Sequence, residues 1–424
     1  MRKFIASGSP LFKRSGGAFT CTSKVFVCAL LALSLCLAGC SALHESDFDK
    51  AEQDTKSELV SASVLSDKEL YTRAKKETQN AEVHIYSSTT VTEKVVSHFI
   101  EKYPAFEGRI IYREMGDEST YPELVQSIES GSSEVDLLIS HSDLVDELTD
   151  AGLVYNYFPL SYRDVVDDEY QMPTAFMLSS TLFMYNSSAG EINISNVWEL
   201  TESEWAGRIL IKNPLEEQVN MNFFTMLSSP EWTEQLQSAY KSYYGYDWQA
   251  KDYKTIADEW TCGFIANCDF SYGSSSDIME QLASGGERKI ALVGYSKLRK
   301  LTSEERSNIA VCGLEGDIEG FCGFAFGTYA TVVCDTQCPY TCALFINYLL
   351  SEEGFSGEGA WNNYFGYYST NETVDKDEVS GDLSLDFWAD RLVIEDSDYL
   401  YIQNSEIEDF TRSCIEARLE ASES

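Results

Sequence analysis

The chain has little positive charge for its length. Of its 424 residues, 31 are Lys or Arg and 69 are Asp or Glu, so the formal net charge at pH 7 is −38. A nucleic acid needs a basic surface on its partner, and an anionic lipid surface attracts basic segments, so this composition argues against both as partners. Hydrophobic residues make up 44% of the chain, enough for a large core, and the length suits two domains or lobes.

Histidine and the local motifs of common enzymes are also scarce. The four histidines are His44, His84, His98 and His141. The sequence contains no Gly-x-Ser-x-Gly elbow, no His-Glu-x-x-His and no phosphate-binding lysine loop. An exported enzyme is therefore the weaker functional class, and we expect neither a catalytic residue nor a cofactor.

A long hydrophobic run is missing as well. Thirteen largely apolar residues, Val25 to Leu37, follow a basic leader, whereas a membrane span needs about 20. This pattern predicts a cleavable export signal over residues 1–39. Leu37-Ala38-Gly39-Cys40 resembles the lipobox of bacterial lipoproteins, which implies that lipid on Cys40 anchors the protein outside the cytoplasmic membrane. The alternative is an ordinary export signal with an incidental cysteine. Residues 40–65 are acidic and polar, which predicts a flexible tether.

Of the twelve cysteines, three lie in the predicted leader, one is Cys40, and eight follow: Cys262, Cys268, Cys312, Cys322, Cys334, Cys338, Cys342 and Cys414. An even number in an exported chain predicts four disulfides. Short spacings favour Cys262–Cys268 and Cys312–Cys322, which leaves Cys414 for one of the other three. Zinc binding is the alternative, but the usual CxxC pairs and a nearby histidine are missing.

Short apolar strands alternate with helical patterns. Strands are predicted at 83–86, 109–112 and 135–139, each separated from the next by a helix. Such alternation predicts an α/β fold with a mostly parallel sheet covered by helices on both faces. A long apolar stretch at 172–185 suits extended chain and leads to a second alternating segment that begins with a strand at 208–211.

Six phrases of the sequence, in order, carry a resemblance to known proteins. They are Glu69-Leu70-Tyr71, Val83 to Ser88, Val135 to Leu138, Val197-Trp198-Glu199-Leu200 through Trp205 to Ile209, Asn213-Pro214, and Leu349 to Phe355. Together they resemble the solute-binding proteins of ABC importers, in the group that includes iron, thiamine, phosphonate and sugar-phosphate binders. The resemblance runs from about residue 67 to about residue 373.

The resemblance implies a two-lobed fold of the type 2 periplasmic-binding-protein kind. Each lobe would hold a mostly parallel sheet flanked by helices, and two extended crossings would join the lobes. We expect lobe 1 at 66–177 and 310–424, and lobe 2 at 178–309. The implied function is that of a monomer that carries a small solute in the interlobe cleft to the permease subunits of an importer. A structural or adhesive surface lipoprotein with the same fold is a further alternative.

Ligands of open α/β sheets bind beyond the carboxyl ends of the strands, and helix N-termini bind anions. The candidate ligand contacts are therefore Ser87, Ser88, Thr89, His141, Ser179, Ser180, Asn222, Ser275, Tyr295 and Ser296. Hydroxyl and amide groups suit a small organic anion, such as a phosphorylated sugar or a phosphonate. Related ferric-ion binders present two tyrosines in tandem, but only Tyr295 stands here. Ferric ion bound by Tyr295 is thus the alternative to an anion, and no other metal ligand is expected.

Overall fold

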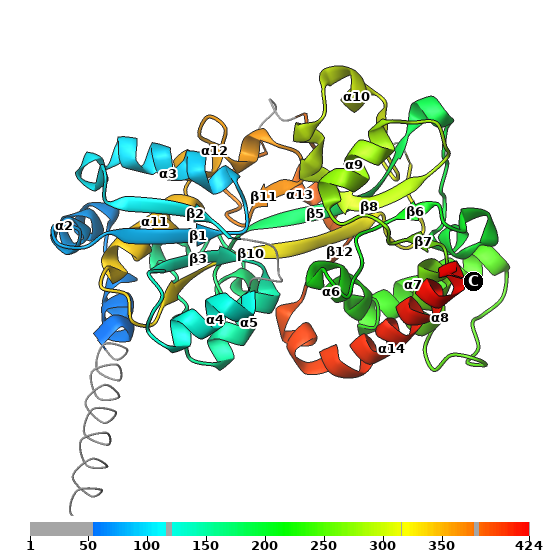
Figure 1. Ribbon diagram of the computed structural model, residues 1–424, viewed down its shortest axis with the longest axis horizontal. Helices are drawn as coiled ribbons and strands as arrows, with labels where there is room; N and C mark the ends of the chain where they lie inside the picture. Colours follow the sequence, from blue (N-terminus) through cyan, green and yellow to red (C-terminus); the bar gives the residue numbers. More distant parts are fainter. Residues whose placement is uncertain (1–53, 116–120, 315, 377–380, 424) are drawn as a thin grey trace, which may run out of the picture. The chain divides into compact units, whose positions relative to one another are not determined.

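The computed structural model describes residues 54–423, apart from 116–120, 315 and 377–380. The predicted signal, the lipidation of Cys40 and the first part of the predicted tether lie outside the described residues. Figure 1 shows the arrangement of the described elements. None of the described helices is both long and apolar enough to cross a membrane.

Among the described residues, twelve strands form one sheet. The strands are β1 (Val83–Ser87), β2 (Ile110–Glu114), β3 (Leu137–Ser140), β4 (Val154–Tyr155), β5 (Ala175–Asn186), β6 (Ile209–Leu210), β7 (Cys268–Asp269), β8 (Ile290–Gly294), β9 (Ile309–Val311), β10 (Gly323–Val333), β11 (Tyr367–Ser369) and β12 (Leu392–Ile394). The main path through the sheet runs β2-β1-β3-β10-β5-β8-β6-β7. Strands β1, β2 and β3 are parallel to one another, and so are β6, β7 and β8.

Helices cover both parts of this sheet (Figure 1). They are α2 (Asp67–Glu77), α3 (Val91–Lys102), α4 (Tyr121–Glu129), α5 (Ser142–Asp150), α6 (Gln218–Met226), α7 (Pro230–Tyr244), α8 (Ile256–Ala266), α9 (Ser275–Ala283), α10 (Ser303–Ser307), α11 (Pro339–Leu350), α12 (Glu352–Ser356), α13 (Leu385–Ala389) and α14 (Ser397–Glu423). We call β1–β3 with α2–α5, α11 and α12 lobe 1, and β6–β8 with α6–α9 lobe 2. The predicted α/β fold class is confirmed.

Two long strands, β5 and β10, join the lobes. They run antiparallel side by side, β10 continues the sheet into β3, and β5 continues it into β8. All residues of both strands are buried, as expected for apolar chain covered on both faces. The two predicted extended crossings are therefore these strands. The return crossing starts at β10 and not at residue 310, because β9 still pairs with the lobe 2 end of β5.

Each lobe has its own aromatic core. In lobe 1, Phe99 stacks on Phe106 with ring centroids 5.5 Å apart. In lobe 2, Trp198 and Trp205 of the resemblance motif are each 1% exposed, and the Trp198 indole donates to the Leu236 carbonyl at 3.1 Å. Both rings fill the lobe 2 core, and the Trp198 indole N–H is satisfied there, whereas the Trp205 indole N–H has no hydrogen-bond partner among the described residues.

Two predicted boundaries differ from the structure. Residues 54–62, expected to be tether, form a helix whose Leu59 and Ala62 side chains are buried against lobe 1. Helix α14, expected in lobe 1, packs on α6 and α8 and buries Ile415 in the lobe 2 core. In both segments, a few apolar side chains at helical spacing outweigh the acidic residues around them.

The predicted set of four disulfides is also corrected. The described residues contain one disulfide, Cys262–Cys414, which spans 152 positions and fastens α14 to α8. The sequence predicts Cys268 as the partner of Cys262, and one of the cysteines at 334–342 as the partner of Cys414. Cys268 begins β7 inside the core, at 1% exposed, whereas Cys262 lies on the side of α8 that α14 covers. Five cysteines are buried thiols, Cys268, Cys312, Cys322, Cys338 and Cys342, and burial raises the pKa of each. Cys334 is buried too.

Candidate functional site

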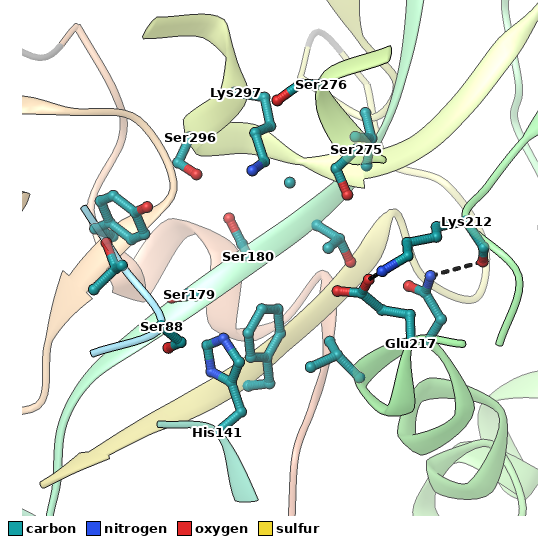
Figure 2. A pocket seen from close by; sticks show the side chains of 18 of the residues that line it. Ser88, His141, Ser179, Ser180, Lys212, Glu217, Ser275, Ser276, Ser296 and Lys297 are labelled. Carbon is teal, nitrogen blue, oxygen red and sulfur yellow. Dashed lines mark hydrogen bonds and ion pairs between the residues drawn. The ribbon is translucent and has the colours of Figure 1, made fainter. Parts of the chain in front are cut away.

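A cavity of about 300 Å³ lies between the two lobes (Figure 2). Lobe 1 contributes the turns that follow β1 and β3, lobe 2 contributes the starts of α6 and α9 and the turn after β8, and β5 crosses the floor. The carboxyl ends of β1, β3 and β8 thus meet at one place, as the topology of open α/β sheets requires.

Seven of the ten predicted contacts line this cavity: Ser88, Thr89, His141, Ser179, Ser180, Ser275 and Ser296. Their role as ligand contacts stays a prediction, but the structure brings them together from both lobes. The Ser88 hydroxyl is buried and has no hydrogen-bond partner among the described residues. A buried hydroxyl without a partner is costly unless a ligand or water satisfies it.

His141 stands at the junction of β3 and α5. Its Nδ1 lies 3.4 Å from the carbonyl oxygen of Gly327 in β10. Its ring meets Phe326 edge to face, with centroids 5.1 Å apart. These two contacts hold the imidazole at the lobe 1 side of the cavity floor (Figure 2).

Three predicted contacts do not line the cavity. The Ser87 hydroxyl lies 2.7 Å from the Thr92 hydroxyl and accepts from the Thr89 N–H at 3.1 Å, so it stabilises the start of α3. The Asn222 amide donates to the Ser142 hydroxyl at 3.2 Å and to Glu395 Oε1 at 3.1 Å. Tyr295 packs against Phe365, with ring centroids 4.9 Å apart, and burial raises the pKa of its phenol. The sequence placed Ser87 and Tyr295 at strand ends and Asn222 before a helix, but none of the three lines the cavity, and Asn222 lies within α6.

The most informative residue of the site was missed in the sequence. Lys297 follows Ser296 in the 3-10 helix η8 (Tyr295–Lys300), lines the cavity, and extends its ammonium group toward Ser180 and Ser296 (Figure 2). Burial lowers the pKa of Lys297. Among the described residues, no side chain or backbone group forms a hydrogen bond or ion pair with this ammonium. A signal was available, because three basic residues stand at 297–300 after a buried strand in an acidic chain.

Other charged groups surround Lys297. Lys212 and Glu217 form an ion pair at the start of α6. Arg299 donates from Nη1 to the Ser296 carbonyl at 2.9 Å and to the Tyr367 hydroxyl at 3.3 Å. Lys212 and Arg299 are therefore engaged with protein groups, whereas Lys297 is not. Lobe 2 makes this side of the cavity locally positive although the whole chain is acidic.

The beginning of α9 adds further donors. Ser274 caps the helix by accepting from the Asp277 N–H at 3.1 Å, and Ser275 and Ser276 of the first turn line the cavity. The first N–H groups of a helix lack partners within it and favour negative charge nearby. Together with Lys297, this turn forms a donor set suited to an oxyanion. Among the described residues, no group of three or more His, Cys, Asp or Glu side chains is placed to hold a metal ion.

Comparison with solved structures identifies the fold. The chain is similar to the periplasmic binding protein AfuA from Actinobacillus pleuropneumoniae, solved with fructose-6-phosphate bound, at a TM-score of 0.57 and 17% identity, covering 80% of this chain and 98% of that one. It is similar to iron-bound HitA from Pseudomonas aeruginosa, at a TM-score of 0.56 and 17% identity, covering 79% and 99%. A Trichodesmium protein in complex with iron and citrate gives 0.55 at 16% identity, covering 80% and 99%.

No protein-family model and no curated protein matches the sequence. The structural likeness nevertheless extends over nearly the full length of the similar proteins. The chain therefore has the two-lobed fold of periplasmic binding proteins, the group that its motifs resemble.

Proposed function

We propose that this protein is the solute-binding component of an ABC importer and captures a small organic anion between its lobes. The favoured ligands are a phosphorylated sugar or a phosphonate. The observation that carries the proposal is Lys297, a half-buried side chain that lines the cavity and whose ammonium group has no hydrogen bond or ion pair with the described residues. Burying a cation is costly unless a counter-charge accompanies it, and a bound phosphate group supplies that charge.

The groups around Lys297 support the same ligand class. Ser88, Ser180, Ser275 and Ser296 present hydroxyls to the cavity, and hydroxyls bind the remaining phosphate or sugar oxygens as donors or acceptors. A volume of about 300 Å³ suits a small ligand. The similar AfuA structure, with fructose-6-phosphate bound, supports this choice within the same fold.

The ferric-ion alternative rested on Tyr295, which lies outside the cavity lining. Two of the similar structures hold iron, so the alternative stays in the test. A thermal-shift and calorimetric screen should compare glucose 6-phosphate, 2-aminoethylphosphonate and ferric citrate. We expect a phosphate or phosphonate to raise the melting temperature, because it binds only the folded form. A shift with ferric citrate alone would contradict the proposal, and turnover of any ligand would favour the enzyme alternative.

We further propose that the protein works outside the cytoplasmic membrane, as a monomer that delivers its solute to permease subunits. Lipid on Cys40 would provide the anchor. Cys40→Ser should move the protein from the membrane fraction to the medium, and the N-terminal peptide of the wild type should carry lipid in mass spectra. Full membrane retention of the variant with an unmodified N-terminal peptide would remove the anchor from the proposal.

A further inference from the structure

A buried carboxylate outside the cavity lining contacts both lobes. Glu395 follows β12 and is 9% exposed. Its Oε1 accepts from the Ser142 hydroxyl at 2.7 Å and from Asn222 Nδ2 at 3.1 Å. Its Oε2 accepts from the Gly327 N–H at 2.8 Å and lies 3.5 Å from the Tyr329 hydroxyl. Asn222 Nδ2 also donates to the Ser142 hydroxyl at 3.2 Å.

These partners belong to different parts of the molecule. Ser142 is the first residue of α5 in lobe 1, Asn222 lies in α6 of lobe 2, and Gly327 and Tyr329 belong to β10, which joins the lobes. Glu395 itself precedes α14, which the disulfide fastens to lobe 2. One carboxylate oxygen therefore connects the two lobes directly, and the other connects them to the crossing strand.

The same elements carry the cavity walls. His141 of the lining immediately precedes Ser142, and Glu217, Val219 and Asn220 of the lining precede Asn222 on α6. The Glu395 contacts therefore set the spacing between the lobe 1 wall and the lobe 2 wall. If the lobes move apart, Ser142 and Asn222 separate, and Oε1 loses at least one donor.

The contacts of the cluster suit a carboxylate. All four neighbouring groups act as donors to Glu395, and a carboxylate has two acceptor oxygens and no donor. A glutamine at this position would turn its NH₂ group toward one pair of donors, whichever way the amide is oriented. Bonds to a charged acceptor are also stronger than those between neutral groups.

We propose that Glu395 is a positioning residue that latches the two lobes in the closed, ligand-holding conformation. The inference deepens the proposed function, since it assigns what keeps the captured solute from leaving. The latch acts through Ser142 and Asn222 and does not itself contact the solute. It lies beyond residue 373, outside the part of the sequence that resembles other binding proteins.

The first test measures closure in the full chain without added solute. Small-angle X-ray scattering should give a larger radius of gyration for Glu395→Gln than for the wild type. Asp398→Asn is the matched control. It removes an exposed carboxylate three residues from Glu395 that is not part of the contacts with Ser142 and Asn222. Asn222→Ala should open the protein too, and the double variant should add little, because both changes break the same contact.

The second test measures release of glucose 6-phosphate by stopped flow. Loss of a bond to a charged group predicts release roughly ten- to a hundredfold faster in Glu395→Gln. Equal scattering and equal release rates for Glu395→Gln, Asp398→Asn and the wild type would overturn the latch. If Glu395→Gln does not fold, Asn222→Ala decides by the same criteria. The scattering result holds even if no phosphate binds, so failure of the proposed function would be seen separately.

Discussion

The two walls of the cavity differ in chemistry. The lobe 1 wall presents the hydroxyls of Ser88 and Thr89, the imidazole of His141 and one carboxylate, that of Glu114 at the end of β2. The lobe 2 wall presents a cationic group, Lys297, beside the first turn of α9. Under the proposed function, this contrast would give the lobes different tasks: lobe 2 would supply the positive charge for an anion, and lobe 1 would supply polar groups that complete the shell around it.

The lobes also differ in how they are held together. Within the described chain, lobe 2 is closed by the Cys262–Cys414 disulfide, while lobe 1 relies on aromatic packing around Phe99 and Phe106. The disulfide fixes α14, and with it the preceding Glu395, to the lobe that carries Lys297. The charged residue Lys297 and the proposed latch residue Glu395 are thus both attached to lobe 2.

The largest expected effect concerns the Cys262–Cys414 disulfide. Replacing Cys262 and Cys414 together by alanine should lower the free energy of unfolding by about 2–4 kcal/mol, because the unfolded chain gains the freedom of a long open loop. Urea unfolding of the variant, beside the wild type with and without reductant, measures this. An unchanged midpoint would mean that packing alone holds α14 in place. The disulfide would then no longer distinguish the stability of lobe 2 from that of lobe 1.

The next largest effect is expected for Lys297→Met on the lobe 2 wall. Loss of an ionic hydrogen bond should weaken phosphate-ester binding by about 3 kcal/mol, or roughly a hundredfold. The empty protein should not be destabilised, since methionine needs no counter-charge. Lys254→Met is the control, because that side chain is 83% exposed. Calorimetry measures the affinity of both variants. Similar affinities would contradict the proposal that the lobe 2 wall supplies the charge that binds the anion.

A smaller loss is expected for Ser88→Ala on the lobe 1 wall. Removing its one hydroxyl contact should weaken binding by about 1.5 kcal/mol, or roughly tenfold. The melting temperature of the empty protein should stay nearly unchanged, because the hydroxyl has no protein partner. Ser97→Ala, at an exposed site on α3, is the control. A drop in melting temperature without a loss of affinity would point to a purely structural hydroxyl.

The smallest effect is a pH dependence that sharpens the role of Lys297. Burial lowers its pKa below the usual 10.5, so between these two values the unfolded chain binds more protons than the empty folded protein. The stability of the empty protein should therefore rise with pH across this window. Anion affinity should fall over the same window, as the ammonium loses its proton. Lys297→Arg should bind with little change up to about pH 10, because guanidinium stays charged. An equal decline in both proteins would assign the dependence to another group.

Much of the fold was predictable because it depends on local patterns. The strands and helices of lobe 1 follow from apolar runs of a few residues and from capping groups, such as Ser66 before α2, where a capping box forms. The candidate hydroxyls were predictable for the same reason, since strand ends locate them. What failed was the direction of individual side chains: Tyr295 and Asn222 stand near strand ends or helix starts, but both point away from the cavity.

The sequence by itself determined the α/β class, the two crossings and the group of proteins that the chain resembles, because each depends on residues that are neighbours along the chain. Only the tertiary structure decided that Cys262 pairs with Cys414, that Lys297 faces the cavity with no partner among the described residues, and that Glu395 joins α5 to α6. These features depend on which distant side chains share a buried space. Burial is a property of the packed molecule, and burial makes a lone charge or hydroxyl costly enough to indicate a ligand.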